Sequence, residues 1–339
     1  MEIVIKNLPK SEVEITGEIA ADDFERSFQK TLLELNAKAN IPGFRAGKIP
    51  ENILLDKIGM GNALERAAEI SLQENYPKIL QKHNIDAIDQ PRITITKLAR
   101  NNPLGFKAII AILPSISLPT DYKMLAQGIM KQKENITIEE KEIADALEYL
   151  RKSRTKNQAP GTQNPEPELN DEFAKKIGQP DLQSLKNLLR TNIREDKERE
   201  AREKKRMETM DKIAGSTPID IPDVLMHAEK SKMLGELKAS IENMGLNWKK
   251  YLDHIKKSEE NLQKEWQEEA GKRVRYALVL REIARIENIN PSEEEIESHI
   301  TRMISAYPES ERKKIDKARL KDYAYGVIRN EKVFQLLES

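Results

Sequence analysis

One stretch decides how the N-terminal part of this chain is organised: Ile41-Pro42-Gly43-Phe44-Arg45-Ala46-Gly47-Lys48-Ile49-Pro50. Two prolines and two glycines at this density end helices and force tight backbone turns. The stretch therefore predicts a short, stiff loop between two helices, the basic loop (residues 41–50). Its centre carries Phe44, Arg45 and Lys48, and an aromatic ring beside two cations suits docking on an anionic, partly apolar surface.

The segments on either side of the basic loop predict a compact α+β domain over residues 1–114. The predicted elements are strands within residues 1–20, helices over 21–39, 50–58 and 62–83, and a strand pair at 92–96 and 106–112 joined by a turn at 101–103. Pro50 suits a helix start, because its missing N–H would be unbonded there in any case. Gly59 is expected to end the same short helix.

The rest of the chain predicts an extended, mostly α-helical C-terminal domain. Residues 115–154 are expected to hold an extended segment at 122–134 and then a linker helix, opened by a capping box of Thr137 and Glu140. Residues 155–168 lack a hydrophobic period and are typical of a flexible linker. The helical C-terminal domain spans residues 169–339, and Asp181 is expected to cap a long helix within it.

Residues 194–206 form a run of interleaved acidic and basic side chains on that long helix. The signs alternate at spacings that allow pairs four residues apart, which predicts a solvated helix face. An arm that binds nucleic acid is the alternative, and the interleaved acids argue against it.

Composition limits the function further. The 339 residues include 57 Lys and Arg and 57 Asp and Glu, so the formal net charge is zero. A general nucleic-acid coat would be basic, so any RNA contact should be local. The absence of cysteine excludes disulfides and thiolate catalysis. The N-terminal residues lack the pattern of an export signal and no segment predicts a membrane span, so the expected location is the cytoplasm.

No catalytic, cofactor or metal site is predicted. The four histidines, His83, His227, His254 and His299, lie far apart and lack the spacing of metal ligands. No glycine pattern matches a phosphate-binding loop. Methionines such as Met226, Met233 and Met244 either fill cores between helices or belong to an adaptable binding surface.

The octapeptide Gly43-Phe44-Arg45-Ala46-Gly47-Lys48-Ile49-Pro50 fills every fixed position of the pattern G-F-R-x-G-K-x-P. This resembles the ribosome-docking signature of bacterial trigger factor, and the stretches 167–174 and 219–222 are similar to later landmarks of that family. The resemblance implies that Gly43, Phe44, Arg45, Gly47 and Lys48 bind the large ribosomal subunit, on a ribosomal protein and rRNA near the tunnel exit. An ordinary basic connector between helices is the alternative.

The resemblance also implies a helical region that shields nascent or unfolded polypeptides without ATP, and it leaves a homodimer open. The chain departs from the family at residues 155–168, where an FKBP-type prolyl-isomerase domain would be inserted. That segment is too short to bury a core and has no aromatic residue for a proline pocket. We therefore expect a chaperone without isomerase activity. A folding enzyme with a degenerate isomerase domain and an envelope chaperone of the SurA kind are the alternatives.

Overall fold

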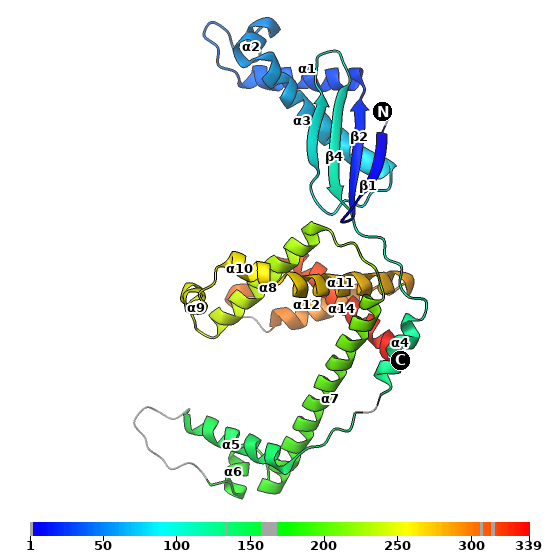
Figure 1. Ribbon diagram of the computed structural model, residues 1–339. Helices are drawn as coiled ribbons and strands as arrows, with labels where there is room; N and C mark the ends of the chain where they lie inside the picture. Colours follow the sequence, from blue (N-terminus) through cyan, green and yellow to red (C-terminus); the bar gives the residue numbers. More distant parts are fainter. Residues whose placement is uncertain (1–2, 133, 157–167, 306–307, 313–315) are drawn as a thin grey trace. The chain divides into compact units, whose positions relative to one another are not determined.

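The computed structural model describes residues 3–132, 134–156, 168–305, 308–312 and 316–339 (Figure 1). The chain divides into two compact units, one of residues 1–117 and 218–278 and the other of residues 118–217 and 279–339. A strand-containing N-terminal region is followed by a mostly helical region, which confirms the predicted fold class. Most of the predicted flexible linker, residues 157–167, lies outside the described residues.

The first unit begins with a four-stranded antiparallel sheet in the order β1-β2-β4-β3. Its elements are β1 (Ile3–Leu8), β2 (Glu12–Ile19), α1 (Ala21–Lys38), α2 (Glu51–Ile58), α3 (Met60–Lys82), β3 (Arg92–Lys97) and β4 (Leu104–Ala111). These bounds confirm the predicted strands and helices to within a few residues. Pro50 is the residue before α2 rather than its first helical residue, and Gly59 ends that helix with φ of 91°.

One hydrophobic core joins this sheet to α1 and α3. Alternate residues of β2 and β4 point to the same face, because Ile15 pairs with Ala108 and Val13 with Ile110. Phe24 and Phe28 of α1 are almost completely buried against that face. The N-terminal domain therefore has a core of its own, on which the basic loop between α1 and α2 is mounted (Figure 1).

Four further helices complete the first unit: α8 (Asp223–Asn243), α9 (Trp248–Ile255), α10 (Glu259–Glu265) and the first part of α11 (Gln267–Ile286). Met226 and Met233 of α8 are buried against Ala270, Val274 and Leu278 of α11. These two methionines fill a core, whereas Met244, just after α8, is 67% exposed. The expectation that methionines fill a core is confirmed for Met226 and Met233, and the binding surface stays a prediction for Met244.

Asp220, in the stretch at residues 219–222 noted in the sequence, bonds the turn between β1 and β2. Its carboxylate accepts hydrogen bonds from the backbone N–H groups of Lys10 and Ser11, the latter at 3.2 Å. Both residues have positive φ in the β1–β2 turn, which aims their N–H groups together. The Ser11 hydroxyl donates to the Asp220 carbonyl at 2.6 Å, so this contact is made within the first unit.

The secondary structure of the second unit, over its described residues, consists of helices and their connecting segments. It consists of α4 (Tyr122–Met130), α5 (Glu140–Lys156), α6 (Asp171–Lys176), α7 (Leu182–Gly215), the end of α11, α12 (Glu293–Ser305), α13 (Glu309–Arg312) and α14 (Lys317–Glu338). The prediction of an extended segment at 122–134 was wrong, because α4 occupies most of it. Tyr122, Ala126 and Ile129 form a buried stripe at helical spacing, and the Tyr122 hydroxyl donates to Glu287 at 2.5 Å.

Helix caps in this unit were predicted with mixed success. Asp181 caps α7 by accepting from the backbone N–H of Ser184 at 2.7 Å, as predicted. The box of Thr137 and Glu140 was placed too early. The helix begins at Glu140, and the Glu142 carboxylate accepts from the backbone N–H of Glu139 at 2.9 Å.

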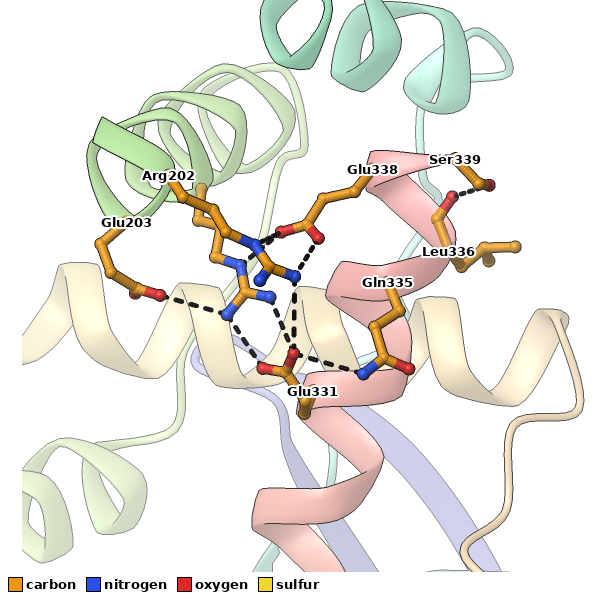
Figure 2. Close-up of polar contacts among 8 residues, drawn as sticks. Arg202, Glu203, Glu331, Gln335, Leu336, Glu338 and Ser339 are labelled. Carbon is orange, nitrogen blue, oxygen red and sulfur yellow. Dashed lines mark hydrogen bonds and ion pairs between the residues drawn. The ribbon is translucent and has the colours of Figure 1, made fainter. Parts of the chain in front are cut away.

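The charge run at residues 194–206 is not a purely solvated face. The Arg206 side chain is only 8% exposed, although most of its neighbours on α7 are open to solvent. It donates to Glu331 of α14 at 2.8 and 2.9 Å and to Glu338 at 2.6 Å. Figure 2 shows Glu331 and Glu338 facing Arg202, which also bonds Glu338. The run therefore joins α7 to α14.

Candidate functional site

The basic loop consists of two successive tight turns. The Phe44 N–H donates to the Ile41 carbonyl at 3.1 Å, and the Lys48 N–H donates to the Arg45 carbonyl at 3.0 Å. Gly43 and Gly47 occupy the third position of each turn, with φ of 87° and 81°. This is the position at which a type II turn requires positive φ, which side chains oppose. The geometry of the two turns therefore accounts for glycine at both positions.

The turns present their side chains to solvent. Every residue from 42 to 48 is exposed, and the Phe44 side chain is 39% accessible although it is fully apolar. Within the part of the chain that the structure describes, Arg45 and Lys48 form no ion pair. An open aromatic ring and two unpaired cations on one turn pair can meet an anionic partner without breaking an internal contact.

The ends of the basic loop are held by the core of the N-terminal domain. Ile49 is 3% exposed and belongs to the core cluster, and Ile41 packs against the same cluster. The Gly47 N–H donates to the main-chain carbonyl of Asn36 at 2.9 Å. This bond satisfies a carbonyl in the last turn of α1, where no helical N–H remains to do so.

A second contact holds the helix that follows the loop. Arg100, from the turn between β3 and β4, donates to Glu51 in the first turn of α2 at 2.6 Å. The same guanidinium lies 4.9 Å from the centre of the Phe28 ring. The hydrogen bond to Glu51 is the main reason why the pKa of Arg100 is raised. Both ends of the basic loop are therefore anchored to the N-terminal domain, by Ile41 and Ile49, and Arg100 fixes the start of α2.

The structure brings the five predicted site residues, Gly43, Phe44, Arg45, Gly47 and Lys48, together on one exposed turn pair. Sequence reasoning missed Asn36, which bonds the returning end of the turn pair, and Arg100, which bonds the helix that follows it. Asn36 is a half-buried polar residue four positions after Leu32, which is buried on the inner side of α1, and this was the available signal. Arg100 gave none, because its partners lie 49 and 75 residues earlier in the chain.

The described residues contain no group of three or more potential ligands that could hold a metal ion. His227 and His254 are exposed, whereas His83, just after α3, and His299, on α12, are half-buried. Across the described helices, none is both long enough and apolar enough to cross a membrane.

Two family models match the chain. The model for the N-terminal part of bacterial trigger factor matches residues 1–150, and the model for the trigger factor C-terminus matches residues 181–338. Only residues 151–180, between the two models, and the last residue are unmatched, so the family models together account for most of the chain.

Curated relatives are similar over nearly their whole length. The trigger factor of Shouchella clausii is 26% identical over 380 residues, which cover 87% of each chain. That of Carboxydothermus hydrogenoformans is 24% identical over 428 residues, covering 100% of this chain and 99% of the relative. A solved structure from work on promiscuous substrate recognition by the trigger factor chaperone shares the fold, with 19% identity and a TM-score of 0.61 over 100% of this chain.

The lengths of these alignments show that the relatives contain positions that this chain lacks. An alignment over 428 positions against a chain of 339 residues leaves about 89 positions of the Carboxydothermus protein without a counterpart here. The stretch between the two matched family models is far too short to hold a further domain. The chain belongs to the bacterial trigger factor family of ribosome-associated chaperones, in a form that lacks the central prolyl-isomerase region.

Proposed function

We propose that this chain docks on the large ribosomal subunit through the basic loop and shields unfolded polypeptides in the cytoplasm without ATP. Gly43 and Gly47 shape the turns, while Phe44, Arg45 and Lys48 contact ribosomal protein and rRNA near the exit of the nascent chain. The observation that carries this proposal is the combination of a solvent-exposed tip with ends fixed in the core.

Co-sedimentation of the purified chain with ribosomes tests this docking. Binding is expected at low salt, and it should weaken on the order of tenfold for a fourfold rise in salt, because two cations replace bound counterions. Binding of the chain to 70S particles and to isolated large subunits should be similar, whereas isolated small subunits serve as the negative control. The absence of binding to large subunits at low salt would contradict the proposal.

The proposed holding surface for clients includes the turn between α8 and α9. Met244 and Leu246 are 67% and 54% exposed on either side of Gly245, whose φ is 76°. None of the residues of α9 is buried, and Trp248 and Tyr251 stack there with ring centres 5.7 Å apart. Flexible methionine and aromatic side chains on an open turn suit contact with apolar segments of many sequences.

Replacing Met244 and Leu246 with serine is expected to weaken the capture of a denatured protein by roughly tenfold, because contact with a client buries these side chains only in part, and each contributes about 1.5–3 kcal/mol when fully buried. Suppression of aggregation measures this effect, and ribosome binding should not change. The pair Met124→Ser and Leu188→Ser, exposed by 72% and 42%, is the matched control. Equal loss in both variants would mean that holding is not concentrated at this turn.

The chain is proposed to have no prolyl-isomerase activity. Uncatalysed isomerisation takes tens to hundreds of seconds, so a refolding reaction limited by proline should keep its slow rate when the chain is added. An FKBP-type isomerase serves as the positive control. Faster refolding that an FKBP-type inhibitor blocks would support the enzyme alternative instead.

A further inference from the structure

Asn36 makes a second set of contacts with the basic loop through its side chain. The amide nitrogen donates to the Ile49 carbonyl at 2.6 Å, and the Ile49 N–H donates to the amide oxygen at 3.1 Å. One side chain therefore satisfies both backbone groups of one residue, as a neighbouring strand would. With the bond from Gly47 to its main-chain carbonyl, Asn36 accounts for three hydrogen bonds to the returning end of the loop.

These bonds set the distance between the end of α1 and the second turn of the loop. Asn36 lies thirteen residues before Ile49, and the exposed tip lies between them. The Ile49 side chain is fixed in the core, but a single packed side chain leaves the backbone free to rotate about it. The paired amide bonds remove that freedom, because they orient the peptide groups of Ile49 itself.

We propose that Asn36 is a positioning residue for ribosome docking, which holds the tip of the basic loop in its binding shape before the ribosome is met. This inference rests on the proposed function of the loop. A loop that is already ordered loses less conformational entropy on binding. If only a fraction of molecules has the binding shape, the apparent affinity falls by that fraction.

If Asn36 affected only the stability of α1, its replacement with alanine should not weaken ribosome binding. Asparagine is a poor helix former and alanine is the best, so Asn36→Ala should slightly favour the helix when the loop is ignored. A weaker interaction with ribosomes in this variant would therefore come from the loop. Asn40, an exposed asparagine two residues after the end of α1, offers the matched control variant Asn40→Ala.

The test compares the full-length chain with Asn36→Ala and Asn40→Ala in two measurements. Hydrogen exchange of the backbone amides in residues 41–50 is expected to become about fivefold to a hundredfold faster in Asn36→Ala, the range set by two lost hydrogen bonds. Affinity for large ribosomal subunits should fall within the same range. The slope of affinity against salt should stay unchanged, since Arg45 and Lys48 are still present. Asn40→Ala should match the wild type throughout.

The outcomes separate this inference from the proposed function. Wild-type chain that fails to bind large subunits overturns the docking function, and this inference with it. Wild-type binding together with unchanged affinity or unchanged exchange in Asn36→Ala overturns the role of Asn36 alone. A reduced salt slope in Asn36→Ala would also overturn it, because that would indicate a lost direct contact with the anionic surface.

Discussion

Replacing Phe44, Arg45 and Lys48 together with alanine is expected to abolish co-sedimentation with ribosomes. A hydrogen bond to a charged group contributes about 1.5–3 kcal/mol, and a central aromatic contact about 2 kcal/mol or more. Such contributions do not add fully, so we expect affinity to fall by at least about a hundredfold. The three side chains are exposed, and their removal should leave the N-terminal domain folded.

A matched control makes this result specific to the loop. Leu33, Arg66 and Lys82 are exposed on α1 and α3, and their replacement with alanine removes the same charge and a similar apolar group. This control should bind ribosomes nearly as well as the wild type. Docking through the basic loop is refuted if the loop variant still co-sediments at low salt, or if both variants lose binding equally.

Replacing Arg206 with alanine is expected to release the end of α14 from α7. The guanidinium is 8% exposed, bonds both Glu331 and Glu338 and lies 4.8 Å from the centre of the Phe334 ring. Its loss leaves two carboxylates near each other without their main partner (Figure 2). Breaking a fully buried pair costs about 3–5 kcal/mol. Because the Glu331 side chain is 43% exposed and can be rehydrated, we expect about 2–3 kcal/mol here.

Hydrogen exchange in residues 331–338 measures this release, and it should become roughly thirty- to a hundredfold faster in Arg206→Ala. Arg199→Ala is the matched control on the same helix. Arg199 and its partner Asp196 are 71% and 65% exposed, so this change should cost no more than about 1 kcal/mol. Similar exchange in the two variants would show that the cluster does not hold α14.

The same cluster should make the attachment of α14 depend on pH. Hydrogen bonds from Arg206 lower the pKa of Glu331 below its ordinary 4.5. Burial opposes ionisation of Glu338, but bonds from Arg202 and Arg206 outweigh it, and the pKa is lowered. Stabilisation is therefore complete above pH 4.5 and is lost as the pH falls through the folded values. Exchange at residues 331–338 should rise in that acid range, beyond the change in intrinsic exchange, and this rise should be smaller in Arg206→Ala, in which Glu338 keeps its bonds from Arg202.

Much of the N-terminal domain could be predicted because its signals are local. Alternating apolar residues marked β2 and β4, and a helical period marked α1. The two glycines of the basic loop marked turns that need positive φ. The exposed placement of Phe44, Arg45 and Lys48 followed from the same turn chemistry, because residues at such turns seldom reach the core.

The failures share a different cause. The segment at 122–134 was predicted as extended, following the crossing marked by Pro114, Pro119 and Asp121. Its helix is stabilised by burial of Tyr122 and Ile129 and by bonds to Glu287, a partner 165 residues further along the chain. Arg206 was placed on a solvated face because its neighbours on α7 are charged, whereas its partners lie 125 and 132 residues away.

From its amino acids alone, this chain could be assigned its two-part fold class, its basic loop and its resemblance to a ribosome-associated family, since each depends on residues close together along the backbone. The three-dimensional arrangement was needed to find how the loop is held by Asn36 and Arg100, and how α7 is joined to α14. Those contacts pair polar groups that desolvation makes costly when alone, and only folding brings their partners within bonding distance.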